Sequence, residues 1–282
     1  MFLFVPFRLC AHSSTPMYVT GTFNSVINTV ARSREPGCAD KAAALLSRME
    51  DLFKAGHTEL LPDNLAFGAI INAYANARSP DSSDKAAGIL QEMESLHQLG
   101  YGDSVKPNTF VYNSALNCFA KQGDAALASQ FLAIMEKESY PGSSIQPDVI
   151  SYSTTINAWA NSNDPKAGEQ ADALLHKMTQ LYLAGGQGDA LKPNAICYTA
   201  AIKAWAASNT DKSCEQVQKR VIELLELMVL QYLAGDRSQK PTKVTFETVQ
   251  EVVQRCKLGN EQETLEWIEA VRKRIDRPAN RR

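Results

Sequence analysis

The sequence predicts an all-α protein, a right-handed α-solenoid of about six stacked helix-turn-helix repeats. A segment that begins with Pro and then Asp or Asn recurs along the chain, and its key aromatic residue returns every 40 to 48 residues. Apolar residues within each copy follow the spacing of one helical face. A second segment, rich in Ala and Leu and ending near a Met, follows each copy. A period of this length is typical of solenoids, in which each repeat buries its apolar face against its neighbours.

The first helix of each repeat is predicted around that aromatic residue. Apolar side chains stand three or four and seven places after it, as Ile156 and Trp159 do after Tyr152, so they share its face and are expected in the core. The solenoid is expected to span residues 18–275, with repeats starting near residues 20, 64, 109, 149, 195 and 243. The aromatic residues are Phe23, Phe67, Tyr112, Tyr152, Tyr198 and Phe246.

The second helix of each repeat is predicted from the matching segments 40–52 and 84–96, with looser versions at 125–136, 169–178 and 221–228. Ala lets two helices approach closely, while Leu and Met fill the seam between neighbouring repeats. Gly56 and Gly185 follow two of these segments and are expected to end their helices. Residues 261–275 are predicted to form the last helix of the array.

The ends of the chain differ from the repeats. Residues 1–17 contain no acidic residue, one Arg and a short apolar run broken by Pro6, and we expect a disordered or targeting segment there. The expected location is intracellular, in a mitochondrion or plastid. Residues 276–282 form a basic tail, read either as a solvated helix end or as a basic patch. No apolar run has the length of a membrane-spanning helix, so no membrane partner is expected.

No group of residues has the spacing of a catalytic or metal site. The four histidines are scattered, and the six cysteines show neither metal-ligand spacing nor a compact disulfide framework. The cysteines therefore suggest a reducing compartment, with Cys118 and Cys197 as small core residues. We expect no enzymatic activity, no catalytic residue, no metal site and no cofactor.

Two columns of mostly polar residues accompany the aromatic stripe and share one helical face. Amides and hydroxyls both donate and accept hydrogen bonds, as base edges require, although such residues can also be plain solvated surface. The first column directly follows the aromatic residue: Asn24, Gly68, Asn113, Ser153, Thr199 and Glu247. The second stands four places further on: Asn28, Asn72, Asn117, Asn157, Lys203 and Glu251.

A third column follows the Pro of each copy. Asp, Asn and Thr just before a helix are common N-caps, so capping is one explanation of this column. The column consists of Asp63, Asn108, Asp148, Asn194 and Thr242.

Over residues 19–275 this pattern resembles the pentatricopeptide-repeat family, most closely in the segment from Phe110 to Leu116 and in the Pro147-Asp148 that ends that unit. The resemblance implies an adaptor that binds single-stranded RNA, one base per repeat, in RNA processing, stability or translation. It also implies that pairs of side chains read the bases, Asn with Asp favouring uracil and Ser with Asn favouring adenine, which gives U-x-U-A-x. The implied pairs are Asn24 with Asp63, Gly68 with Asn108, Asn113 with Asp148, Ser153 with Asn194, and Thr199 with Thr242.

A protein-interaction scaffold is the alternative function. The chain has 29 basic and 31 acidic residues, so its overall charge does not favour a nucleic acid. The concave surface of a solenoid also serves protein partners. The sequence leaves both partners open, single-stranded RNA and protein.

Overall fold

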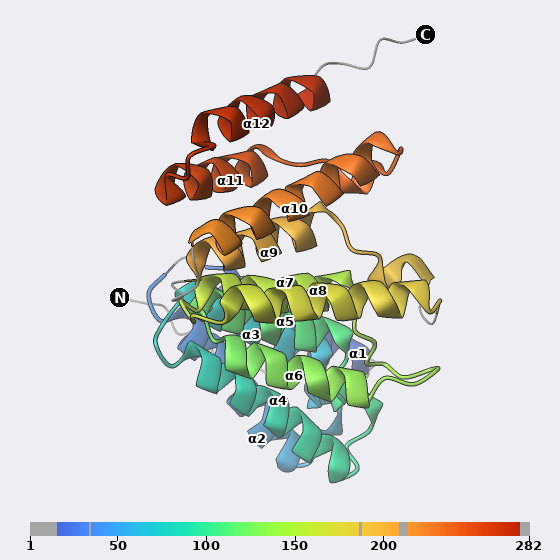
Figure 1. Cartoon of the computed structure of the whole chain (residues 1–282). Coiled ribbons are helices and arrows are strands. Elements are labelled where there is room, and N and C mark those ends of the chain that lie inside the picture. Colours follow the sequence, from blue (N-terminus) through green and yellow to red (C-terminus); the bar gives the residue numbers. More distant parts are fainter. Residues whose placement is uncertain (1–15, 34, 186–187, 209–213, 277–282) are drawn as a thin grey trace.

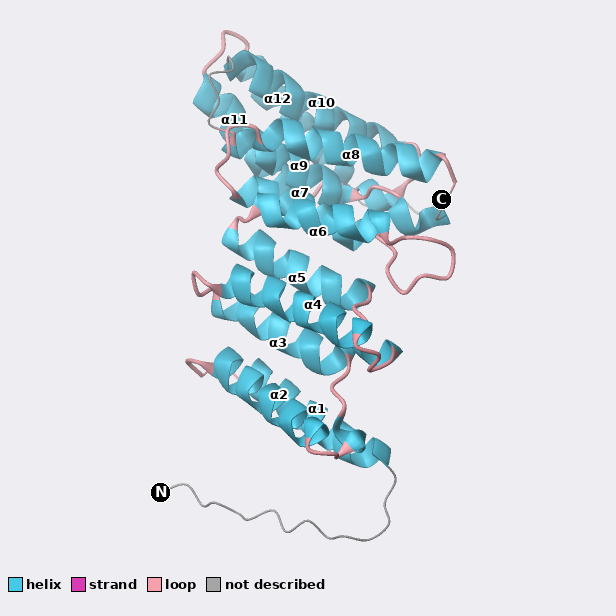
Figure 2. Ribbon diagram, turned by 90° about the horizontal axis from the view of Figure 1, so that it is seen from below, coloured by secondary structure: helices cyan, strands magenta, loops and turns pink. Residues whose placement is uncertain are grey.

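The computed structural model describes residues 16–33, 35–185, 188–208 and 214–276, and over these ranges the protein consists of helices and connecting loops without a strand (Figures 1 and 2). The predicted all-α solenoid is confirmed. The first helices of the repeats are α1 (Pro16–Arg32), α3 (Asn64–Ala77), α5 (Thr109–Gln122), α7 (Val149–Asn161), α9 (Ala195–Ala207) and α11 (Lys243–Cys256). The second helices are α2 (Cys38–Lys54), α4 (Ser82–Gln98), α6 (Ala125–Lys137), α8 (Ala167–Leu183), α10 (Cys214–Leu233) and α12 (Glu261–Asp276).

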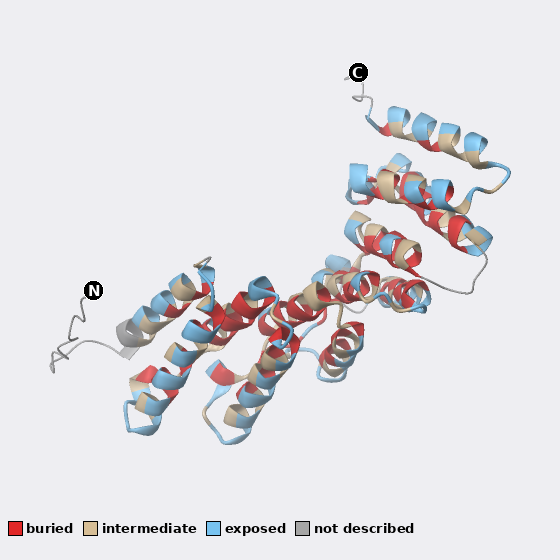
Figure 3. Cartoon of the chain, turned by 90° about the vertical axis from the view of Figure 1, so that its left-hand side faces the viewer, coloured by how far each residue is buried: buried red, intermediate tan, exposed pale blue. Residues whose placement is uncertain are grey.

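The helices form two layers. Each odd-numbered helix packs against the next odd-numbered one, so these helices make a continuous inner layer from α1 to α11. Each even-numbered helix from α2 to α10 packs against the first helix of its own repeat and that of the next, and so lies in an outer layer. Helix α9 packs against α11 less extensively than α7 packs against α9. Figure 3 shows the array bending between its N-terminal and C-terminal units.

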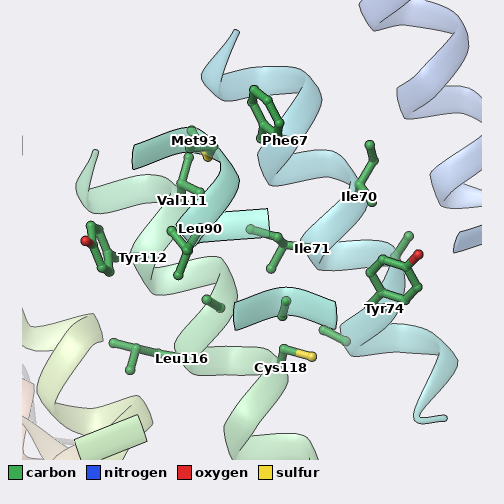
Figure 4. Packing of buried hydrophobic residues seen from close by; sticks show 14 of the residues in the cluster. Phe67, Ile70, Ile71, Tyr74, Leu90, Met93, Val111, Tyr112, Leu116 and Cys118 are labelled. Carbon is green, nitrogen blue, oxygen red and sulfur yellow. The ribbon is translucent and has the colours of Figure 1, made fainter. Parts of the chain in front are cut away.

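The core runs through the whole array because the apolar face of each repeat packs against the next repeat. Five of the six key aromatic residues are buried, and Phe23 of the first repeat is partly buried. Figure 4 shows Phe67 and Ile71 of α3, Leu90 and Met93 of α4, and Tyr112 of α5 in one such packed region. Each second helix from α2 to α10 has a fully buried methionine at its seam: Met49, Met93, Met135, Met178 and Met228.

Not every stripe residue is buried. Val26, three places after Phe23, was predicted in the core but is 46% exposed, and Trp159 also departs from the prediction. Trp159 was predicted in the core but is only half-buried, between the two halves of the core. Its indole Nε1 donates a hydrogen bond of 2.9 Å to Ser129 Oγ on α6. An indole needs a partner for its N–H, and a position at the edge of the helix pair supplies one.

The connections between repeats carry a feature that the sequence did not predict. Short 3₁₀ helices lie before the first helices of four repeats, at Thr58–Leu60, Asp103–Val105, Gly188–Leu191 and Arg237–Gln239. Each of these 3₁₀ helices buries one side chain, such as Leu60 or Val105, in the core of the array. Gly56 and Gly185 have positive φ values of 107° and 74° directly after their helices, so both glycines end helices as predicted.

The cysteine prediction was wrong in one respect. Cys214 at the start of α10 and Cys256 at the end of α11 form a disulfide, with 5.3 Å between their Cα atoms. Stacking of two repeats brings together residues that are 42 positions apart, which residue spacing could not reveal. Cys118 and Cys197 are buried free thiols, as expected.

The predicted targeting segment 1–17 and basic tail 276–282 lie outside the described residues, except that Pro16 and Met17 belong to α1 and Asp276 ends α12. None of the described helices is long and apolar enough to cross a membrane. The described part of the chain also contains no cluster of His, Cys, Asp or Glu that could hold a metal ion.

Candidate functional site

The third polar column caps the first helices of the repeats. All five side chains accept hydrogen bonds from backbone N–H groups in the first turn of the helix that follows. Asp63 Oδ1, for example, accepts from Leu65 N at 3.0 Å and from Ala66 N at 3.1 Å. The capping explanation is therefore confirmed for the whole column, and it holds each of these side chains in one orientation. The capping residues are Asp63, Asn108, Asp148, Asn194 and Thr242.

Two of the five implied pairs are in direct contact. Asn24 Nδ2 donates to Asp63 Oδ2 at 2.9 Å, and Asn113 Nδ2 donates to Asp148 Oδ1 at 3.2 Å. In the second pair Ser151 Oγ donates to Asn113 Oδ1 at 2.7 Å, so the amide is fixed from both sides. Asp63 and Asp148 thus each orient an amide on the preceding first helix.

The other three implied pairs differ. Thr199 Oγ1 lies 2.8 Å from Thr245 Oγ1, which in turn lies 3.0 Å from Thr242 Oγ1, so this pair is connected through a third hydroxyl. Ser153 Oγ donates to the carbonyl of Ile150, 3.3 Å away, and so turns to its own helix. The remaining pair has no side chain at its first position.

Gly68 occupies that position, and an aromatic ring covers it. A Cβ atom on Gly68 would lie 2.5 Å from Cε1 of Phe110, so the ring rests where a side chain stands in the other repeats. Phe110 is nevertheless half exposed, and it lines a groove together with Asn24, Asp63 and Asn72. The second repeat therefore presents an aromatic face and one amide, that of Asn108.

A row of exposed apolar residues was missed by the sequence reasoning. Each stands two places after a capping residue, and their exposed fractions range from 45% for Val244 to 66% for Ile196. A recurring apolar residue three places after each Pro, out of phase with the core stripe, was the available signal. Apolar side chains held in solvent at the same point of five repeats suggest a ligand. The row consists of Leu65, Phe110, Ile150, Ile196 and Val244.

Two grooves connect the polar columns with this apolar row along the inner layer. The first contains Asn28 and Asn76 beside Leu65 and Phe110. The second contains Asn117 and Asn157 beside Ile196 and Val244, with Thr199 and Thr242 at its side. The prediction that the first two polar columns share a face is confirmed by these linings.

Positive charges stand at intervals on the same layer. Arg32 lines the first groove and Lys203 the second. Lys121 Nζ donates to Asn76 Oδ1 at 2.7 Å, which holds its charge between two repeats. On the sixth repeat the columns turn acidic with Glu247 and Glu251, and Glu247 forms a 3.5 Å ion pair with Lys243.

Comparison with known proteins finds a family match for one segment and a structural match for the array. No curated protein matches the sequence. A family model for the pentatricopeptide repeat domain matches residues 101–162. Eleven chains among the solved structures match, and one of them is the crystal structure of the pentatricopeptide repeat protein PPR10 from maize. The match with PPR10 has 21% sequence identity and a TM-score of 0.54, and covers 92% of this chain.

Residues 101–162 thus match the pentatricopeptide repeat domain, and the fold of the chain is similar to that of a pentatricopeptide repeat protein. The chain spans about 30% of the length of the maize chain, so the similarity concerns the repeat array. The matched segment 101–162 contains α5, α6 and α7, with the capped and hydrogen-bonded pair Asn113 and Asp148. The inner layer of this chain combines two oriented polar pairs with exposed apolar residues in five repeats.

Proposed function

We propose that this protein is an adaptor that binds single-stranded RNA along its inner layer, without catalysing a reaction. The observation that carries the proposal is that a helix-capping polar residue stands two places before an exposed apolar residue in five repeats, and that two of these caps hold an amide of the preceding first helix. A nucleobase has a polar edge and two apolar faces. The surface offers both kinds of contact at the spacing of one helical repeat.

Each contact has a distinct part in binding. The apolar row accepts base faces, a contact worth about 1 to 3 kcal/mol per base and tolerant of base identity. The polar pairs supply identity, and in the pairs at Asn24 and Asn113 the cap already fixes the amide. Family resemblance assigns uracil to the pairs at Asn24 and Asn113 and adenine to the pair at Ser153, in the order U-x-U-A-x. Arg32, Lys121 and Lys203 stand where phosphates can follow the strand.

The proposal is tested by titrating the full chain with fluorescent single-stranded RNA that contains U-x-U-A-x. The double variant Asn113→Ala and Asp148→Asn is the informative one, because Asn is as good an N-cap as Asp and the helix start is kept. We expect it to lose roughly tenfold in affinity for the U-containing strand. Ser95→Ala on the outer helix α4, where the hydroxyl only contacts its own helix, is the control and should bind like wild type. Equal, weak binding of every oligonucleotide by wild type and variant would refute base reading.

A protein partner is the second candidate function. It is favoured by the near-neutral charge of the chain and by the acidic pair Glu247 and Glu251 on the inner layer of the last repeat. An apolar row of this kind also accepts side chains of a peptide. Recovery of one protein partner after nuclease treatment, with no RNA bound in titrations, supports this second function over the first.

The proposal also includes the biological process and the organelle in which the protein acts. We propose that the protein acts in RNA processing, stability or translation within a mitochondrion or plastid, on the basis of the acid-free segment 1–17. A fluorescent protein fused after residue 40 should enter one of these organelles. Uniform cytosolic fluorescence overturns the location while leaving RNA binding untouched.

A further inference from the structure

The disulfide between Cys214 and Cys256 lies at the junction between the fifth and sixth repeats. It joins the first residue of α10 to the last residue of α11. Helix α11 is the inner helix of the sixth repeat, and α12 behind it buries only Ile268 and Ile275 completely. The sixth repeat therefore depends mainly on α11 for its attachment to the array.

The corresponding place in two earlier junctions is closed by hydrogen bonds. Cys118 of α5 donates its thiol to the carbonyl of Ser82 at the start of α4, at 3.5 Å. Ser208 after α9 accepts from Gly168 N at the start of α8, at 2.9 Å. In each case the C-terminal part of an inner helix is tied to the start of the outer helix before it, with Cys118 four residues before the end of α5 and Ser208 directly after α9. At the last junction a disulfide between Cys214 of α10 and Cys256 of α11 takes the place of such a hydrogen bond.

The inner-layer packing at this junction is also the less extensive one, since α9 and α11 share less contact than α7 and α9. A covalent bond adds most to the stability of a junction where the non-covalent contacts across that junction are fewest. It closes a loop across 42 residues and so removes much of the freedom of the separated repeat.

The other cysteines differ from this pair in their surroundings. Cys118 and Cys197 are buried, and burial raises the pKa of each thiol to about 11, which keeps both protonated and unreactive. Cys214 and Cys256 are half-buried, so a small thiol can reach them. Thiol–disulfide exchange at Cys214 and Cys256 would leave the buried thiols of Cys118 and Cys197 unchanged.

We propose that Cys214 and Cys256 form a reversible redox latch, whose disulfide holds the sixth repeat against the fifth and whose reduction loosens that repeat. Oxidation uses a small disulfide such as oxidised glutathione. One cysteine thiolate attacks the small disulfide and expels one thiolate, and the second cysteine attacks the mixed disulfide and expels the other. Two electrons pass from the cysteine sulfurs to the small disulfide, and the two protons lost by the cysteines end on the two reduced thiols.

The latch affects the inner surface directly. Helix α11 carries Thr245, whose Oγ1 lies 2.8 Å from that of Thr199 on α9. It also carries the exposed Val244 of the second groove. Loosening α11 therefore opens the C-terminal end of the inner surface, whatever ligand that surface binds.

The test is hydrogen exchange measured by mass spectrometry on the full chain, equilibrated with oxidised or with reduced glutathione. Thiol alkylation of the same samples reports whether the disulfide is present. We expect the amides of α11 and α12 to exchange about tenfold or more faster in the reduced protein, with α3 and α5 unchanged. The double variant Cys214→Ser and Cys256→Ser should exchange at the fast rate in both buffers, while Cys38→Ser should respond like wild type.

Two results overturn the latch. One is alkylation of both cysteines in oxidised glutathione, which shows that the disulfide does not form. The other is unchanged exchange in α11 and α12 when the disulfide is reduced. The wild-type comparison needs no substitution, so it decides the question even if the double variant folds poorly.

Discussion

Glu50 on α2 is a buried carboxyl group that lacks the partner its counterparts have. Tyr112 donates its hydroxyl to Glu94 at 2.9 Å, and Tyr152 donates to Glu136 at 2.6 Å. Each glutamate directly follows the seam methionine, and each tyrosine is the key aromatic of the next repeat. For Glu50 the aromatic at that place is Phe67, which has no hydroxyl.

The environment of Glu50 raises the pKa of its carboxyl group. Glu50 is 8% exposed and its Oε1 has no hydrogen-bond partner. Burial, together with the neighbouring Glu92, raises the pKa of Glu50 from 4.5 to about 7; Asp51 adds to this effect and Lys54 opposes it. Because the folded state holds this proton more tightly than the unfolded state, the free energy of unfolding falls as pH rises from about 4.5 to 7 and then levels off. The shift corresponds to a loss of at most roughly 3 to 4 kcal/mol.

Phe67→Tyr should place a donor beside Glu50 and recover part of this loss. A hydrogen bond to a charged group contributes about 1.5 to 3 kcal/mol, and fitting the hydroxyl into a full core offsets some of it, so we expect a net gain of about 1 kcal/mol at pH 8. The gain should be smaller at pH 5, where Glu50 is protonated. Urea unfolding at the two pH values measures it.

Glu50→Gln is the matched control for this experiment. It keeps the shape of the side chain and removes the charge, so its stability relative to wild type should rise between pH 5 and pH 8. If wild type, Phe67→Tyr and Glu50→Gln differ by the same amounts at both pH values, the assigned environment of Glu50 is wrong.

Two further predictions concern backbone geometry and the apolar row. Gly123 has a φ of 77°, and a Cβ there would lie 2.5 Å from the backbone oxygen of Asn161, so Gly123→Ala should cost about 2 kcal/mol or more in urea unfolding. Gly88→Ala inside α4, with nothing within 4 Å, should instead gain about 0.5 to 1 kcal/mol, and the reverse order would contradict the structure. Phe110→Ala should lower RNA affinity by about 1 to 3 kcal/mol in a binding titration, while Leu99→Ala, an exposed apolar residue at the end of the outer helix α4, should leave it unchanged. Equal effects of these two substitutions would remove Phe110 from the binding surface.

The sequence predicted the features that depend on short-range spacing. The key aromatic of each first helix, the caps such as Asp148, and the glycine stops such as Gly56 are set by neighbours within a few residues. Their burial or hydrogen bonding follows from helix periodicity alone. The order of the helices was therefore predictable before any contact between repeats was known.

Features that depend on stacking of two repeats were not predictable in this way. Cys214 meets Cys256, and Phe110 covers Gly68, only because successive repeats lie side by side. The position of Trp159 at the edge of the core depends on the same packing. The exposed apolar row is different, since its regular place after each Pro was visible in the sequence and its meaning became clear only from its exposure.

Base reading by the polar pairs is tested most directly by exchanging one pair for another. Asn113→Ser combined with Asp148→Asn gives the third repeat the pair that the fourth repeat has in Ser153 and Asn194, and it keeps a good N-cap. Affinities are measured for two RNA strands that differ only by uracil or adenine at the third place of U-x-U-A-x. Wild type should prefer uracil and the variant adenine, each by about tenfold. An unchanged ratio of the two affinities would contradict base reading by these pairs.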